Sequence, residues 1–169
     1  QKAAQNLGLN TMVMNFSQES WALDFEDGTK MSGLRSEHVR EAAAVISQYC
    51  DMIAIRAFAS LSDKEKDEAE IVLKSFTEYA SVPIINMESA TAHPLQAVAD
   101  AITLKEFKTP HKPKVVLTWA PHPKALPHAV GNSFTKMMEN LDADFIIAHP
   151  DGYAPVSYTH LRAHETVRN

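Results

Sequence analysis

Short apolar runs alternate along the chain with longer segments in which apolar residues recur at every third or fourth position. The apolar runs are residues 11–16, 51–56, 82–86, 114–119 and 143–148. Runs of this length and character are typical of strands that are buried on both faces. The longer segments, which have the period of amphipathic helices, are residues 36–49, 63–80, 93–107 and 126–141. This alternation predicts an α/β fold with parallel sheets, flanking helices and right-handed crossovers.

The segment at residues 93–107 begins in an unusual way. Its apolar positions, spaced by three or four residues, are Leu95, Val98, Ala99 and Ile102. In front of them stands His93 instead of a Ser or Asp cap, followed by Pro94 at the first helical position, where a missing N–H costs nothing. Gln96 lies in the first turn. An imidazole and an amide at the start of a helix suggest a role beyond packing.

The composition is that of a folded globular protein. The 169 residues are 45% hydrophobic and 22% charged, enough for one domain or two small ones. The net charge of -5 and the lack of Lys and Arg runs give no electrostatic footprint for nucleic acid or an anionic membrane. No apolar run approaches the about 20 residues of a membrane span. We interpret the charged cluster DKEKDEAE, residues 63–70, as the solvated face of a helix.

The single cysteine bears on the cellular compartment. Cys50 lies between a helical pattern and an apolar run, which favours a buried, reduced thiol over a nucleophile. Gln1 opens no charged-then-apolar signal pattern. We therefore expect a soluble, cytoplasmic protein and a chain that begins inside a longer sequence.

The last residues, 156–169, lose the rhythm of the preceding chain. The stretch VSYTHLRAHET resembles one reading frame of a transposase-type sequencing adapter, so we expect a non-native tail and exclude it from the fold. His160 and His164 have the spacing of a zinc-binding helix, but Leu161 stands where the zinc-protease motif needs its Glu base. We expect no metal there and no cofactor elsewhere.

Polar side chains follow several of the predicted strands. In an open parallel sheet, ligands bind beyond the carboxyl ends of the strands. The residues expected near that edge are Arg56, Asn86, Glu88, His93, Gln96, Trp119 and His122. A cation, an imidazole, an amide and a helix N-terminus together suit a small, highly charged anion with a polarisable carbonyl group. Each residue alone has an ordinary structural explanation, but their convergence predicts a functional site.

The segment HPLQAVAD, residues 93–100, resembles the H-P-x-Q-x-x-A-D signature of the transcarbamylases. Five stretches resemble the N-succinylornithine and N-acetylornithine carbamoyltransferases in the same order: QKAAQNLG, FSQESWALDFEDGT, HVREAAAVISQYCDMIAIRAF, NMESATAHPLQAVADAIT and TWAPHPKALPHAVGNSF. The resemblance covers residues 1–155. It implies transfer of the carbamoyl group from carbamoyl phosphate to the side-chain amine of an N-acylated ornithine, in arginine biosynthesis.

The resemblance implies catalytic roles for three residues. His93 and Gln96 would hold the carbonyl oxygen and the amide of the carbamoyl group. Arg56 would add positive charge to the same oxygen as it becomes a tetrahedral oxyanion. Fixed donors at a developing oxyanion are an effective means of lowering such a barrier.

Three further residues are implied in substrate binding. Trp21 would reach into the phosphate site of a neighbouring subunit, which implies a homotrimer; the alternative is a half-buried anchor. Glu88 and His122 would contact the acylated ornithine. The alternatives are a helix-start carboxylate for Glu88 and a rigid turn for His122.

The resemblance also divides the chain. Residues 1–107 would be a carbamoyl-phosphate-binding domain without its N-terminal part, ending in an interdomain helix, and residues 108–155 would begin the N-acylornithine-binding domain. The linker would be KTPHKPK, residues 108–114. The family's Ser-x-Arg-Thr-Arg phosphate loop and its downstream Cys-Leu-Pro motif are not in the sequence. We therefore expect an incomplete two-domain architecture and a 169-residue chain that is inactive by itself.

Two alternatives from other classes remain. A flavodoxin-like or Rossmann nucleotide-binding module has the same alternation, although no G-x-G-x-x-G follows a strand. A non-catalytic anion-binding or structural α/β domain would not need polar side chains to converge at the strand ends. Acyl selectivity is also open, because residues 32–38 lie where family members differ and Ser36 does not decide it. Overall similarity favours N-succinyl-L-ornithine over N-acetyl-L-ornithine.

Overall fold

A computed structural model of the chain describes residues 1–16, 22–28, 35–107, 111–119 and 126–149, with backbone only at residues 35 and 36. Its elements, in chain order, are α1 (Lys2–Asn6), β1 (Ala22–Asp24), β2 (Arg35–His38), α2 (Val39–Ile46), β3 (Ile53–Arg56), α3 (Lys64–Ala69), α4 (Ile71–Tyr79), β4 (Ile84–Glu88), α5 (Pro94–Glu106), β5 (Lys114–Thr118), α6 (Ala129–Met138) and β6 (Asp144–Ala148).

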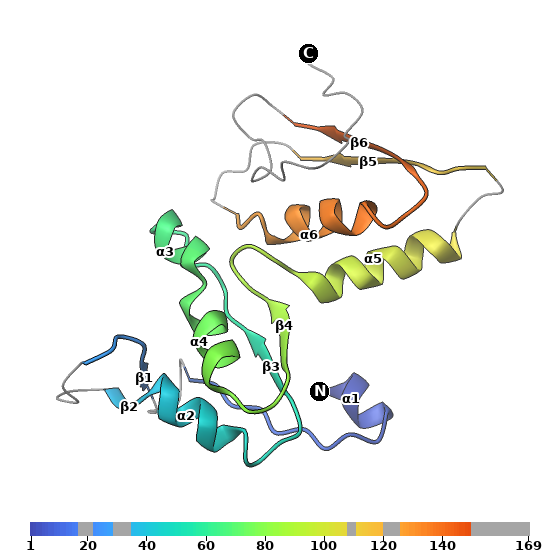
Figure 1. Cartoon of the computed structure of the whole chain (residues 1–169). Coiled ribbons are helices and arrows are strands. Elements are labelled where there is room, and N and C mark those ends of the chain that lie inside the picture. Colours follow the sequence, from blue (N-terminus) through green and yellow to red (C-terminus); the bar gives the residue numbers. More distant parts are fainter. Residues whose placement is uncertain (17–21, 29–34, 108–110, 120–125, 150–169) are drawn as a thin grey trace.

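The described strands form parallel pairs, β1 with β2, β3 with β4 and β5 with β6 (Figure 1). Helices α3 and α4 connect β3 to β4, and α6 connects β5 to β6. Parallel strands need crossovers of this kind because a tight turn cannot bring a second strand back in the same direction. The predicted α/β class with parallel strands and flanking helices is confirmed. The division into two domains stays a prediction.

One of the five strand predictions was wrong, and two strands were missed. Residues 11–16 form no strand, and Met12 and Val13 are exposed. An apolar run becomes a strand only where another strand pairs with it, and no pairing in the described part of the chain includes these residues. Conversely, β1 and β2 were not predicted, because they are only three and four residues long and carry charged side chains.

The segment at residues 63–80, predicted as one helix, is two helices. The break between α3 and α4 lies at Glu70, whose backbone is left-handed (φ 49°, ψ 42°). Asp63 caps the first of these helices, because its Oδ1 accepts a hydrogen bond from the Lys66 N–H at 3.2 Å. A left-handed backbone is uncommon for a residue other than glycine, so a helical period in the sequence could not reveal this break.

The principal apolar core lies among α2, α4 and the first two strand pairs. It consists of Leu23, Val39, Ala42, Ala43, Ile46 and Phe76. Helix α2 begins after His38, whose Nδ1 accepts a hydrogen bond from the Arg40 N–H at 3.2 Å. The side chain of Ile53, from β3, packs against this core from the sheet side. This packing fixes β3 and β4, whose carboxyl ends carry the candidate site.

The last part of the described chain packs around α6, which lies between α5 and the β5–β6 pair (Figure 1). Phe134 of α6 contacts Phe145 of β6, with ring centroids 6.0 Å apart. The helix predicted at residues 93–107 is confirmed as α5, but its apolar face is largely exposed; Val98 and Ile102 are 55% and 53% exposed.

For β3 and β5, the prediction of strands buried on both faces was also wrong. Along β3 and β5, half-buried and exposed residues alternate, which is the pattern of strands covered on one face only. Val116 of β5 is an exposed example. None of the helices in the described ranges is long and apolar enough to cross a membrane.

Candidate functional site

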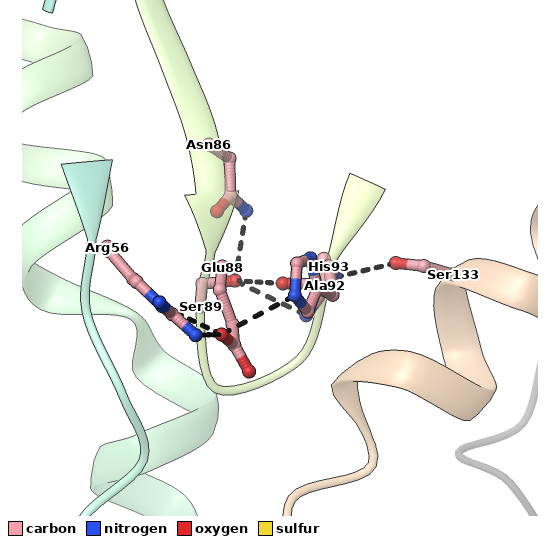
Figure 2. Close-up of polar contacts among 7 residues, drawn as sticks. All are labelled: Arg56, Asn86, Glu88, Ser89, Ala92, His93 and Ser133. Carbon is pink, nitrogen blue, oxygen red and sulfur yellow. Dashed lines mark hydrogen bonds and ion pairs between the residues drawn. The ribbon is translucent and has the colours of Figure 1, made fainter. Parts of the chain in front are cut away.

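The candidate site lies where β3 and β4 end side by side (Figure 2). Arg56 is the last residue of β3 and lies opposite Glu88, the last residue of β4. The register shifts by one residue just before this pair, between Ile55 and Arg56. The Ala57 N–H donates to the backbone carbonyl of Glu88 at 2.9 Å, which holds the two strand ends together. The carboxyl ends of parallel strands are the usual place for a ligand in such folds.

Arg56 and Glu88 form a close ion pair. Nε and Nη2 of Arg56 donate to Oε2 of Glu88 at 2.9 and 2.6 Å. The Glu88 side chain is 11% exposed, whereas that of Arg56 is 54% exposed. A buried carboxylate is costly unless a cation pairs with it, so the ion pair with Arg56 offsets the cost of burying Glu88. The exposed part of the guanidinium is still free to reach a ligand.

Phe58 supports Arg56 from another direction. The Cζ atom of Arg56 lies 4.6 Å from the centroid of the Phe58 ring, which is cation–π distance. The guanidinium is therefore held both by a carboxylate and by an aromatic ring. Phe58 was not predicted as a site residue, although an aromatic residue two positions after a strand-end Arg is a signal that sequence reasoning could have used.

His93 brings an imidazole to the same place. Its Nε2 lies 3.5 Å from Oε2 of Glu88, and its backbone N–H donates to Oγ of Ser133 in α6 at 2.7 Å. The ordinary explanation of a histidine at a helix start is a cap, but the side chain of His93 makes no capping hydrogen bond to α5. Within the described part of the chain, its buried Nδ1 has no hydrogen-bond partner.

The turn between β4 and α5 is closed by its own hydrogen bonds (Figure 2). Ser89, which is buried, donates from its backbone N–H to the carbonyl oxygen of Ala92 at 2.8 Å. The Oγ of Ser89 accepts from Nδ2 of Asn86 at 3.0 Å. Asn86, predicted to lie at this edge, therefore shapes the turn that separates Glu88 from His93.

The structure does not bring Gln96 into this cluster. Its Nε2 donates to Oδ1 of Asp100, one turn later in α5, at 2.9 Å. Trp119 follows β5, in a different strand pair from Arg56, and its ring stacks on that of His149 at a centroid distance of 5.5 Å. Trp21 and His122 lie outside the described residues. No three His, Cys, Asp or Glu side chains of the described residues gather where they could hold a metal ion.

The loop after β3 is fixed by an acidic side chain. Oδ1 and Oδ2 of Asp67, in α3, accept hydrogen bonds from the N–H groups of Ser60 and Leu61 at 2.8 and 2.9 Å. Leu61 has a positive φ of 60° and needs such a restraint. Asp67 belongs to the cluster interpreted as a solvated helix face, so a structural role of that cluster was missed.

We expect acid to release this loop. The Ser60 N–H, against an opposing effect of desolvation and with help from the Leu61 N–H, holds the pKa of Asp67 below its ordinary value of 3.8. The folded pKa is thus the lower one, so the stabilisation is complete well above pH 3.8 and is lost as the pH falls through the folded pKa. The amide chemical shifts of Ser60 and Leu61, followed by NMR against pH, should report this. If they titrate identically in Asp67→Asn, another group is responsible.

The comparisons with known proteins identify the family. The family model for the aspartate/ornithine carbamoyltransferase, carbamoyl-P binding domain, matches residues 1–106. This chain belongs to the aspartate/ornithine carbamoyltransferase family. The match decides against a nucleotide-binding module, which the alternation of strands and helices had left open as an alternative. It also confirms the resemblance seen in HPLQAVAD.

Relatives of this chain have specific names. It is 47% identical to the N-succinylornithine carbamoyltransferase of Bacteroides thetaiotaomicron over 174 aligned residues, covering 98% of this chain and 55% of that protein. It is 41% identical to the N-acetylornithine carbamoyltransferase of Xanthomonas campestris, covering 87% of this chain and 44% of that protein. This chain spans about half the length of the curated relatives that it matches.

Solved structures of acetylornithine transcarbamylase have the same fold. The complex with acetylcitrulline is 39% identical and has a TM-score of 0.80, and the match covers 89% of this chain and 46% of that one. A mutant of N-acetyl-L-ornithine transcarbamylase complexed with carbamyl phosphate and N-succinyl-L-norvaline is 40% identical, also with a TM-score of 0.80. In the family member described here, Arg56, Glu88 and His93 lie together at one strand edge.

Proposed function

We propose that the whole protein transfers the carbamoyl group of carbamoyl phosphate to the side-chain amine of an N-acylated ornithine, in arginine biosynthesis and without a metal or cofactor. The observation that carries this proposal is the meeting of Arg56, Glu88 and His93 at the carboxyl ends of β3 and β4. Relatives that share this chain's sequence are named N-succinylornithine and N-acetylornithine carbamoyltransferases.

The proposed chemistry needs positive charge at one oxygen. Attack by the amine forms a C–N bond and places negative charge on the carbamoyl oxygen before the C–O bond to phosphate breaks. The exposed face of Arg56 and the imidazole of His93 would stabilise that oxyanion. Gln96 would hold the carbamoyl amide after turning away from Asp100. The departing phosphate takes the proton that the amine loses.

Glu88 would orient the side chains of Arg56 and His93 and contact the acylated ornithine. Its contacts to Arg56 and His93 use Oε2, so Oε1 is the atom that we assign to the substrate amine. The amine must be neutral when it attacks, and a closed site that excludes water favours the neutral form. It would also protect the carbamoyl phosphate, a mixed anhydride, from hydrolysis.

The remaining assignments rest on family resemblance. Trp21 would reach the phosphate site of a neighbouring subunit, which makes the proposed assembly a homotrimer, and His122 would contact the acylated ornithine. We propose residues 1–107 as the carbamoyl-phosphate domain, residues 108–155 as the start of the ornithine domain and residues 156–169 as a non-native tail. The cytoplasm is the proposed location, because the substrates are central metabolites and the single Cys50 is free.

An assay of the complete gene product that contains this chain would test the function. It should form an acyl-citrulline from carbamoyl phosphate and N-succinyl-L-ornithine, more slowly from N-acetyl-L-ornithine and least from free L-ornithine. A colour reaction for the ureido group measures all three. The 169-residue chain by itself should give no product.

Two results would contradict the proposal. If free L-ornithine is turned over as fast as the N-acylated ornithines, the substrate does not need an acyl group. Binding of carbamoyl phosphate, measured by calorimetry, without product from any of the three amines would favour the non-catalytic anion-binding alternative.

A further inference from the structure

We propose that Glu70 is a positioning residue for the Arg56, Glu88 and His93 cluster. It lies outside the cluster, at the junction of α3 and α4, and acts through the turn between β4 and α5. The consequence for catalysis rests on the proposed function, whereas the placement of the turn does not.

The backbone of Glu70 is held in an unfavourable conformation. Its φ of 49° and ψ of 42° are left-handed values, which glycine adopts freely and other residues adopt at a cost. Such strain persists only where surrounding contacts determine the conformation, and it is often found near functional sites. The break directs the chain out of α3 and starts α4 with the Glu70 carboxylate facing the neighbouring turn.

The carboxylate of Glu70 accepts two hydrogen bonds from Thr91 in that turn. Oε1 of Glu70 accepts from the backbone N–H of Thr91 at 3.0 Å and from the Thr91 hydroxyl at 2.8 Å. Burial by itself raises the pKa of Glu70, but hydrogen bonds from Ser89 and Thr91 and the charge of Lys74 outweigh it, so the pKa lies below its ordinary value. The group is therefore ionised at neutral pH, and its hydrogen bonds are of the stronger, charge-assisted kind.

Helix α6 holds the same turn from the other side. The Thr91 carbonyl accepts from Nδ2 of Asn132 at 3.1 Å, and the His93 N–H donates to Oγ of Ser133 at 2.7 Å. Asn132 is buried. Thr91 is thus fixed between the start of α4 and the first turns of α6, and it lies between Glu88 and His93 in the sequence.

The position of this turn decides the geometry of the cluster. Glu88 ends β4 immediately before the turn and His93 follows it, so a displacement of Thr91 changes the distance between the Glu88 carboxylate and the His93 imidazole, now 3.5 Å. Misplacement of reacting groups by about 1 Å can cost on the order of 100-fold in rate. Glu70 therefore has an effect on the cluster without touching any of its members.

The test separates backbone strain from the hydrogen bonds. Glu70→Gly relieves the left-handed strain but removes the carboxylate, so the chain should fold at least as well while the turn loosens. Glu70→Gln keeps an acceptor oxygen at the same distance from the backbone, so it should retain most of the hydrogen bonding to Thr91 that Glu70→Gly loses. Glu78→Ala, at an exposed carboxylate of α4, is the matched control.

The first readout is NMR on the 169-residue chain. In Glu70→Gly, the Thr91 amide should exchange about tenfold faster and the ring signals of His93 should shift, while the amides of core residues such as Phe76 keep their protection. Glu78→Ala should change none of these. Unchanged Thr91 exchange in Glu70→Gly, or an equal loss of protection at Phe76, would overturn the proposal.

The second readout is kinetics of the complete gene product. Glu70→Gly should lower kcat for carbamoyl transfer on the order of 100-fold with the melting temperature preserved, and Glu70→Gln should recover most of it. If the unaltered complete protein shows no transfer, the proposed function fails, and the Thr91 exchange still decides whether Glu70 positions the turn.

Discussion

Replacement of Arg56 by methionine in the complete gene product should lower kcat for carbamoyl transfer by about 100- to 1000-fold, the usual effect of removing one donor from a developing oxyanion. Arg56 is oriented by two hydrogen bonds to Glu88 and by the Phe58 ring, so its charge is in place before the reaction. Donors that are fixed in advance need no reorganisation in the transition state. The rate with saturating carbamoyl phosphate and N-acylornithine measures the effect.

The methionine variant has a second consequence that must be separated from the first. It leaves Glu88, only 11% exposed, without its cation, and an uncompensated buried carboxylate destabilises a fold. Arg56→Lys keeps a positive charge beside Glu88 but loses the planar set of N–H donors, so it should be stable and still slow.

A matched control is available on the surface. Lys64→Met removes an exposed cation whose ion pair with Glu68 spans 3.6 Å, and exposed pairs of this kind contribute little. Its rate and melting temperature should equal those of the parent. Full activity in Arg56→Lys would show that a point charge suffices, and full activity in Arg56→Met would remove Arg56 from the mechanism.

Truncation of the Phe76 side chain to alanine should lower the free energy of unfolding of the 169-residue chain by about 3–5 kcal/mol. Phe76 is 4% exposed and reaches from α4 into the cluster that includes Val39 and Ile46 of α2. Removal of its ring leaves a cavity between helices that cannot close fully, so the lost transfer energy and the cavity both count. Urea denaturation followed by circular dichroism gives the value.

The comparison is with an aromatic residue that contributes no core contact. Tyr49 is 75% exposed, and Tyr49→Ala should change the free energy of unfolding by no more than about 0.5 kcal/mol. Equal effects of the two substitutions would mean that the core of α2 and α4 does not limit stability. Because this core packs against β3, its loss should also loosen the strand end that carries Arg56.

The sequence predicted the helices and strands that have a clear hydrophobic pattern within their own residues. Amphipathic periods in residues 36–49 and 93–107 correspond to α2 and α5, and continuous apolar runs correspond to β3 to β6. The short strand β1 has no such pattern. It is a strand because it pairs with β2, and that pairing is not visible in its own residues. Residues 11–16 have the pattern without a partner strand among the described residues. The left-handed backbone of Glu70 divides the predicted helix at residues 63–80 into α3 and α4, and the hydrophobic period of the sequence does not reveal this break.

The same distinction holds for the site. Arg56 and His93 could be found because strand ends and a helix start are positions at which parallel folds gather polar groups. Glu70, Asn132 and Ser133 could not, since each contacts a turn that is 21 to 41 residues away in the sequence and has no motif of its own. Their roles follow from tertiary contacts that only the folded chain displays.

The parallel pairing of the strands also has a consequence for how fast the protein folds. Ile53 pairs with Ile84 and Lys114 with Asp144, so neither pair can form until the chain between its strands has closed a long loop. Contacts between residues far apart in sequence carry this entropy cost before they contribute any stability. Folding is therefore intrinsically slower than in a hairpin-based protein of similar size, and the edges of these strands stay open to pairing with other chains until each crossover has closed.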